Sequence, residues 1–224
     1  MAYNQKPLSK SHKTNYVREK DEWDFRMEPN QFRAMLRHIS RLPRRLIKKE
    51  FRDRDYMMMV LLGNTGMRIG ELIILEKTHL SRINAKYPLI MVPTLKQDKL
   101  KGKPVYLHPR VAGKIKEYMA SYVRENDRFI FEGMSGEGHL SDRWVRQIFY
   151  SYVDALGFEE KYSPHCLRHM FIANTFNKTR DEIFVRDQAR HASMGKGLGV
   201  TEKYLGKYNP REKYDLAIKT GAMV

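Results

Sequence analysis

A run of seven apolar residues, residues 56–62, constrains the fold of this chain more than any other segment. The run ends a predicted helix, expected over residues 44–62, whose first half is charged and whose second half has no polar face. A helix that is apolar on all sides must be covered by other elements, so we expect this half at the centre of the protein. The run is far shorter than the ~20 residues that cross a bilayer, which argues against a membrane partner.

Helical periodicity covers most of the remaining chain. The stripe formed by Phe32, Met35, Leu36 and Ile39 predicts a helix over residues 28–42. Similar stripes predict helices that begin near residues 67 and 164 and helices over residues 109–124, 141–156, 179–191 and 210–224. Two short apolar runs, residues 89–92 and 105–107, predict the strands of an antiparallel hairpin. The predicted fold class is α+β, mostly α-helical, with one small β-hairpin.

The charge of the chain favours a polyanionic partner. Lys and Arg number 42 against 26 Asp and Glu, a formal net charge of +16, which points first to nucleic acid and second to an anionic membrane. Residues 1–27 form a basic N-terminal arm, expected to be poorly ordered alone, that either lies on DNA or is a solvated tail. The single cysteine, Cys166, permits no internal disulfide and fits a reducing compartment such as the cytoplasm.

Residues 163–169 carry the most distinctive local motif, Ser-Pro-His-Cys-Leu-Arg-His. Pro164 suits the first position of a helix, because proline has no N–H to lose there and its φ is already helical. His165 and Arg168 are then three residues apart and project from one face of that helix. A histidine that exchanges protons beside an arginine that binds oxyanions suits phosphate chemistry, although such pairs are more often ordinary surface features.

A second arginine lies where a loop is expected to meet a helix. Residues 63–66, Gly-Asn-Thr-Gly, predict a break, and the next helix opens near Met67 and Arg68. Unpaired backbone N–H groups at such a junction can add to anion binding. Glu71 lies three residues further on the same face, where it either holds Arg68 in place or forms an ordinary helix pair.

Further basic residues gather on the predicted hairpin and on one later helix. The hairpin carries Lys96, Lys99, Lys101 and Lys103. These lysines either touch a phosphate backbone, with one of them delivered into a site, or keep the strand edges soluble. In the helix predicted over residues 141–156, Arg143 and Arg146 face either a DNA groove or solvent.

Four segments follow one another in an order that is more specific than any one of them. They are residues 65–72, the lysine-rich segment from Lys96, residues 163–169, and His191 followed by Tyr204. In this order they resemble the tyrosine recombinase, or integrase, family over roughly residues 28 to 208. Two features depart from the family pattern: Ala189-Arg190-His191 stands where Leu-Gly-His is usual, and Tyr204 lies 13 residues beyond His191, a few more than usual.

The resemblance implies an attack on DNA by a tyrosine, which gives a 3′-phosphotyrosyl link and a free 5′-hydroxyl. Tyr204 would be the nucleophile, and Tyr208 is the competing candidate. Arg68 and Arg168 would stabilise the charge on the pentavalent phosphorus transition state, and Glu71 would orient its neighbours. The resemblance implies no metal and no ATP, because the covalent link conserves the bond energy for religation.

Proton transfer and phosphate binding would fall to other residues. By the resemblance, Lys96 would protonate the leaving 5′-oxygen. Lys99 or Lys101 matches better when the count runs back from the following strand, because this hairpin is longer than usual. His165 would assist proton transfer at the tyrosine or bind the phosphate, and His191 would hydrogen-bond the phosphate.

The same resemblance implies the domain organisation and the partners. Residues 28–208 would form the catalytic domain, with a C-terminal helix or tail over residues 209–224, and residues 1–27 are too short for the usual N-terminal DNA-clasping domain. The expected partners are duplex DNA with a specific crossover site and further copies of the chain, as a dimer or tetramer on that DNA. A type IB topoisomerase, which relaxes supercoils without crossover sites, and a binding-only descendant are the alternatives.

Overall fold

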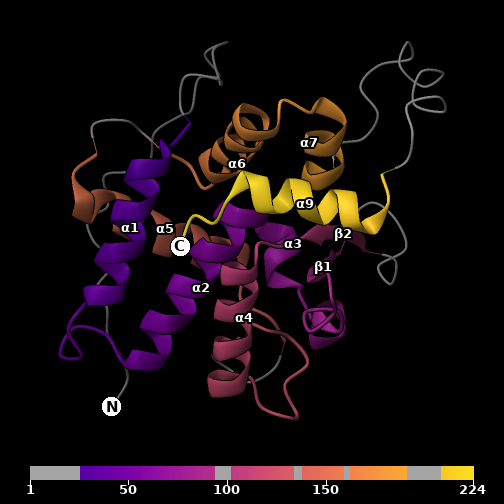
Figure 1. Cartoon of the computed structure of the whole chain (residues 1–224). Coiled ribbons are helices and arrows are strands. Elements are labelled where there is room, and N and C mark those ends of the chain that lie inside the picture. Colours follow the sequence, from indigo (N-terminus) through magenta and orange to yellow (C-terminus); the bar gives the residue numbers. More distant parts are fainter. Residues whose placement is uncertain (1–25, 94–101, 134–137, 159–161, 191–207) are drawn as a thin grey trace.

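Helix α2 (Lys49–Thr65) lies at the centre of the structure, a computed structural model that describes residues 26–93, 102–133, 138–158, 162–190 and 208–224 (Figure 1). Helices α1 (Pro29–Arg41), α4 (Pro109–Tyr122) and α6 (His165–Thr179) pack against it. The six residues from Met57 to Leu62 are each at most 3% exposed. The predicted central burial of the apolar run is confirmed, and its methionines are core residues.

The beginning of α2 lies later than the predicted residue 44. Residues 43–48 form a turn in which Leu46 is 57% exposed and Ile47 is buried. The charged residues Arg44 and Arg45 ahead of Ile47 are exposed and offer no apolar face to pack. The helix therefore begins only after the extended residue Lys48.

The end of α2 also differs from the prediction, which placed a break at residues 63–66. Gly63 is helical, and a Cβ at this position would lie 2.3 Å from the ring of Phe32. This glycine therefore allows α1 to approach α2 closely instead of forming a turn. The helix ends at Gly66, whose left-handed φ of 58° is typical of a glycine C-cap.

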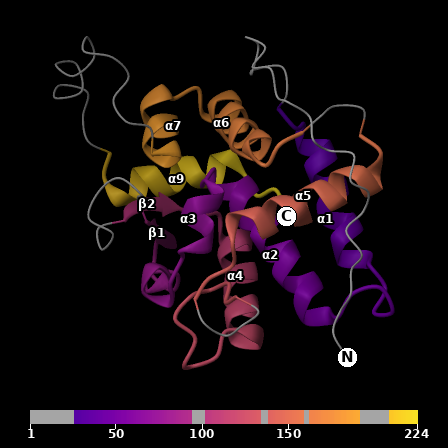
Figure 2. The ribbon, with the colours of Figure 1, turned by 180° about the vertical axis from the view of Figure 1, so that it is seen from behind.

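Helix α5 (Asp142–Leu156) packs against α1 and α3 (Ile69–Ile73), and both α1 and α5 begin and end close to where their sequence signals predict. The inner stripe of α1 is at most 3% exposed, which confirms the predicted amphipathic helix. The Ser141 hydroxyl caps α5 by accepting a hydrogen bond from the Trp144 backbone N–H at 3.2 Å. Figure 2 shows α5 on the face opposite to helix α9 (Pro210–Thr220).

The predicted hairpin is present. Strands β1 (Leu89–Val92) and β2 (Lys103–Tyr106) form an antiparallel two-stranded sheet within the described residues, with Leu89 opposite Tyr106 and Val92 opposite Lys103. A short 3-10 helix, η1 (Lys77–Leu80), packs on β1, and the helix α3 (Ile69–Ile73) precedes it. The fold is mostly α-helical with a small antiparallel sheet, as predicted.

The C-terminal part of the chain packs back onto the central helices. Helix α9 lies across α6 and β2, and α7 (Glu182–Ala189) lies beside both α6 and β2 (Figure 1). Asn64 fixes the last turn of the chain through two hydrogen bonds with the backbone of Met223, at 3.0 and 2.8 Å. None of the described helices has the length and apolar character needed to cross a membrane.

Candidate active site

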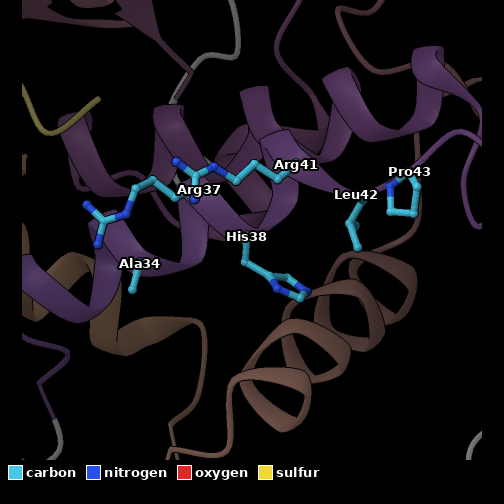
Figure 3. Close-up of a pocket in the computed structure, with 6 residues that line it drawn as sticks. All are labelled: Ala34, Arg37, His38, Arg41, Leu42 and Pro43. Atoms are coloured by element: carbon cyan, nitrogen blue, oxygen red, sulfur yellow. The ribbon is translucent and has the colours of Figure 1, made fainter.

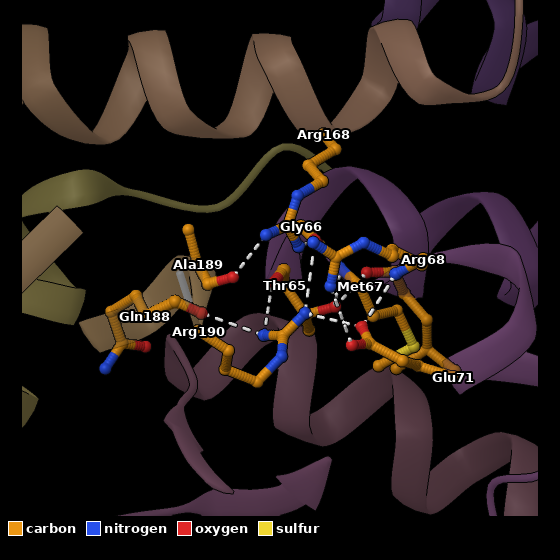
Figure 4. A network of polar contacts seen from close by, with 10 residues as sticks. Thr65, Gly66, Met67, Arg68, Glu71, Arg168, Gln188, Ala189 and Arg190 are labelled. Atoms are coloured by element: carbon orange, nitrogen blue, oxygen red, sulfur yellow. Dashed lines mark hydrogen bonds and ion pairs between the residues drawn. The ribbon is translucent and has the colours of Figure 1, made fainter. Parts of the chain in front are cut away.

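The turn that ends α2 is where side chains from distant segments meet (Figure 4). The carbonyl oxygen of Gly66 accepts hydrogen bonds from the guanidinium groups of Arg168 and Arg190, the latter at 3.1 Å. The left-handed backbone at Gly66 favours glycine, and a Cβ there would lie 2.4 Å from the ring of Phe171. Both the turn and its packing therefore depend on the absence of a side chain at residue 66.

Arg168 enters this cluster from α6 and is only 2% exposed. One of its terminal nitrogens donates to the carbonyl of Gly66 and the other to the carbonyl of Ala189. Burial, and then the positive charges of Arg68 and Arg190, lower the pKa of Arg168 to about 10. The group is still charged at neutral pH, so a buried cation lies at the centre of the cluster.

Arg68 is the exposed arginine of the cluster, with a side chain that is 48% exposed. It is the N-cap residue of α3, at the junction of loop and helix that the sequence predicts. Its guanidinium donates to one carboxylate oxygen of Glu71 at 3.2 Å, and its backbone N–H donates to the other at 2.8 Å. Glu71 thus forms an i,i+3 pair with Arg68 and also caps the first turn of α3.

Arg190 is the member of the cluster that sequence reasoning missed. It is the C-cap of α7, with a left-handed φ of 57° and a side chain that is 1% exposed. Its guanidinium donates to the carboxylate of Glu71 at 2.9 Å and to the carbonyls of Thr65 at 3.1 Å and Gln188 at 2.8 Å. The one available signal was an arginine at a position where the family pattern has glycine.

His165 begins α6, one residue after the predicted start at Pro164, and is exposed. Its ring lies edge-on to that of His169, with centroids 4.6 Å apart. It is three residues before Arg168 on the same helix, as predicted. The neighbouring Cys166 is buried, and this burial raises the pKa of its thiol to about 12, which agrees with the predicted packed thiol.

Tyr208 is held by helix α7. Its hydroxyl donates a hydrogen bond to the carboxylate of Asp181, the N-cap residue of α7. This hydrogen bond, together with burial and the Asp181 charge, raises the pKa of Tyr208 to about 12. The phenolate form of Tyr208 is therefore harder to reach than that of an ordinary tyrosine.

The other predicted site residues are either outside the described residues or exposed on the surface. Lys96, Lys99, Lys101, His191 and Tyr204 lie outside the described residues. Lys103 is exposed on β2, and Arg143 and Arg146 are exposed on α5, where Arg146 pairs with Asp142. The described residues thus bring together Arg68, Glu71 and Arg168 from the predicted set.

A separate hollow of about 410 Å³ lies along α1 and its following turn (Figure 3). It is lined by Ala34, Arg37, His38, Arg41, Leu42 and Pro43 and shares no residue with the arginine cluster. Within the described ranges, no group of three His, Cys, Asp or Glu side chains is placed to hold a metal ion.

The fold and the cluster agree with the comparison of the sequence with family models. Residues 26–205 match the phage integrase family. This match covers most of the chain and includes all four segments that resemble the family. The chain therefore belongs to the phage integrase family, and the predicted resemblance is confirmed.

Curated relatives carry the name tyrosine recombinase. A tyrosine recombinase of Pseudothermotoga lettingae is 29% identical over 163 residues, which cover 73% of this chain and 52% of the relative. The tyrosine recombinase XerC of a Methylobacterium species is 32% identical over 143 residues, 63% of this chain and 43% of the relative. The chain thus spans about half the length of these curated relatives.

Solved structures share the fold. The XerH site-specific recombinase bound to its difH substrate has a TM-score of 0.62 at 22% identity, over 82% of this chain and 50% of XerH. The integrase of transposon Tn1549, in complex with circular intermediate DNA, has a TM-score of 0.55 at 18% identity, over 82% of this chain and 61% of that protein. At these identities the likeness is one of fold.

Proposed function

We propose that this chain is a site-specific DNA recombinase that cleaves and rejoins duplex DNA through a 3′-phosphotyrosyl intermediate. The observation that carries the proposal is the joining of Arg68 and Arg168 through Glu71, Arg190 and the Gly66 carbonyl. The guanidinium of Arg68 is half-exposed, and that of Arg168 is fixed by its hydrogen bonds to two backbone carbonyls. Preorganised cations of this kind stabilise charge that develops in a transition state.

The reaction in this proposal is a transesterification. The Tyr204 oxygen bonds to phosphorus while the bond from phosphorus to the 5′-oxygen breaks. The tyrosine proton passes to a base, for which His165 is the candidate, and the leaving 5′-oxygen takes a proton from Lys96. Attack by a different 5′-hydroxyl reverses these steps, so the balance of bonds requires neither ATP nor a metal ion.

Arg168 retains donors for this role although it is buried. A guanidinium has five N–H donors. The carbonyls of Gly66 and Ala189 each accept a hydrogen bond from one terminal nitrogen, so other N–H donors remain. In this proposal the N–H donors that remain bind the non-bridging oxygens of the phosphate. Arg68, which is 48% exposed, would make the first contact with the DNA backbone.

The assignment of Tyr204 rests on its sequence context and on the state of its competitor. The Tyr208 hydroxyl donates a hydrogen bond to Asp181, and its pKa of about 12 opposes formation of the attacking phenolate. This bond also holds the Tyr208 side chain against α7. Both effects favour Tyr204 as the nucleophile.

Duplex DNA with a specific crossover site is the proposed substrate, and a dimer or tetramer on that DNA is the proposed assembly. The net charge of +16 supports a polyanionic partner. XerH is bound to its difH substrate and the Tn1549 integrase to circular intermediate DNA, which supports the same class of substrate. His191 would bind the scissile phosphate, and Lys99, Lys101, Lys103, Arg143 and Arg146 would contact the DNA backbone.

The test is covalent trapping on a nicked suicide duplex. The cognate site is first found by sequencing DNA fragments that the full chain retains, and the duplex carries a nick beside the cleavage position so that religation fails. We expect an adduct that survives denaturing electrophoresis, forms in EDTA, disappears in Tyr204→Phe and persists in Tyr208→Phe. Mapping of the DNA to Tyr208 would overturn the assignment of the nucleophile, and the absence of any adduct would favour the binding-only alternative.

A further inference from the structure

Arg190 adopts a backbone conformation that favours glycine, yet it keeps a long charged side chain there. Its φ is 57°, and its side chain is almost wholly enclosed, with 1% exposed. Glycine would adopt this conformation without strain, so the backbone alone gives no reason for an arginine. The reason must lie in what the side chain contacts.

The Arg190 side chain joins three segments of the protein. It donates to the Thr65 and Gly66 carbonyls at the end of α2, each at 3.1 Å. It donates to the Glu71 carboxylate in α3 at 2.9 Å and to the Gln188 carbonyl in α7 at 2.8 Å. The planar guanidinium, with donors in a fixed fork, fits these four acceptors in a way that a lysine ammonium does not.

Both proposed phosphate-binding arginines depend on groups that Arg190 holds. The Glu71 oxygen that accepts from Arg190 also accepts from the Arg68 backbone N–H, and the other oxygen of Glu71 accepts from the Arg68 side chain. The Gly66 carbonyl that accepts from Arg190 is also a main acceptor for Arg168. Figure 4 shows Arg190 between these partners on the side away from α6.

Arg190 is the enclosed charge partner of Glu71. The Glu71 side chain is 3% exposed, and a buried carboxylate is stable in its charged form only with close cations. The neighbouring Arg68 is half-exposed and turned partly to solvent, so Arg190 is the enclosed partner of Glu71. Arg68 is thereby left able to bind a second anion without taking the charge partner away from Glu71.

We propose that Arg190 is a positioning residue of the active site, which fixes the Glu71 carboxylate and the Gly66 carbonyl so that Arg68 and Arg168 are aligned on the scissile phosphate. This inference rests on the proposed function and adds a residue to it. Arg190 itself is enclosed and does not touch the DNA. Its effect is therefore on the rate of cleavage, and DNA affinity depends on it little.

The main variant is Arg190→Gly, which removes the side chain and relieves the backbone at the same time. Its matched control is Arg180→Gly, because Arg180 is also a left-handed C-cap, with φ of 56°, but is exposed at the end of α6 and lies over Phe176 outside the cluster. Each is assayed with the full chain for DNA affinity and for single-turnover adduct formation at saturating suicide duplex.

We expect Arg190→Gly to bind DNA within about threefold of the natural chain and to form the adduct ~10- to 100-fold more slowly, as misplacement of catalytic groups does. Arg180→Gly should match the natural chain in both. Because Arg190 acts in part through Glu71, the loss in the double variant with Glu71→Gln should be smaller than the product of the two single losses. An unchanged cleavage rate in Arg190→Gly, or fully multiplicative losses in the double variant, would overturn the inference.

Arg190→Lys keeps the test informative where Arg190→Gly fails to fold. It retains a positive charge beside Glu71 but loses the fork, so folding should survive while cleavage falls and binding holds. Cleavage at the natural rate would overturn the inference. The natural chain is the positive control: if it forms no adduct, the proposed function fails and the inference with it. If the natural chain forms the adduct and both Arg190 variants form it at the natural rate, the inference alone is rejected.

Discussion

Arg168 donates a hydrogen bond to the backbone carbonyl of Gly66, 102 residues earlier in the chain, and so ties α6 to the turn that ends α2. This contact joins the two arginine-bearing motifs of the sequence. It depends on a backbone acceptor, whose position is set by the conformation of residue 66. Substitutions at Gly66 should therefore affect both the stability of the fold and the alignment of the arginines.

We expect Gly66→Ala to destabilise the protein more than Gly157→Ala does. Both glycines have a left-handed φ, of 58° and 61°, but a Cβ at residue 157 meets nothing within 4 Å, whereas one at residue 66 would lie 2.4 Å from Phe171. The conformational effect alone is about 1 kcal/mol, and the clash adds roughly 1–3 kcal/mol at Gly66. Urea unfolding of the two variants measures the difference, and equal losses would show that the packing against Phe171 is unimportant.

Arg168→Lys separates geometry from charge. The guanidinium bridges the carbonyls of Gly66 and Ala189, and an ammonium group cannot hold both while it binds a phosphate. We expect near-normal DNA binding and a loss of cleavage of at least ~100-fold, as when one oxyanion donor is removed. The control, Arg45→Lys in the exposed turn before α2, should cleave normally. A parallel loss of binding and cleavage would identify Arg168 as an ordinary DNA contact.

Local signals predicted most of the fold. The apolar stripe of α1, the Ser141 cap of α5 and the turn-separated strands β1 and β2 each act over a few residues, so the sequence carries them directly. The predicted start of α2 at residue 44 was wrong, because the charged stretch before Lys49 is compatible with a helix in sequence. In the structure Ile47 is buried in the turn before the helix, and no local signal in the sequence marks this burial.

The candidate site was only partly predictable for the same reason. Arg68 and Glu71 are three residues apart, and their pairing followed from helix geometry. Arg190 lies 119 residues from Glu71, and no spacing rule connects them. The unusual arginine before His191 marked a departure from a pattern, but its partners emerged only when the ends of α2 and α7 were seen side by side.

Tyr208 should titrate late. Its hydrogen bond to Asp181 raises its pKa to about 12, above the ordinary value near ~10 for a tyrosine. Because the folded state binds this proton more tightly than the unfolded state, the stabilisation is fully present below about pH 10 and is lost as the pH rises through about 12. Difference titration in the near ultraviolet, natural chain against Tyr208→Phe, measures it. Asp181→Asn should return the pKa towards its ordinary value, and a pKa that stays unchanged in this variant would exclude Asp181 as the cause.

The lysines of the hairpin should set part of the salt dependence of DNA binding. Lys103 is exposed on β2, directly opposite Val92, and begins the strand that follows Lys99 and Lys101 in the chain. Each lysine that neutralises a phosphate releases bound counterions, so replacement of all three by glutamine should lower the slope of log K against log salt by up to ~2.7. The variant should unfold at the same temperature as the natural chain, because these changes leave the apolar face of the sheet intact. A slope that stays the same would place the hairpin outside the DNA interface, and its lysines would then serve to keep the strand edge soluble.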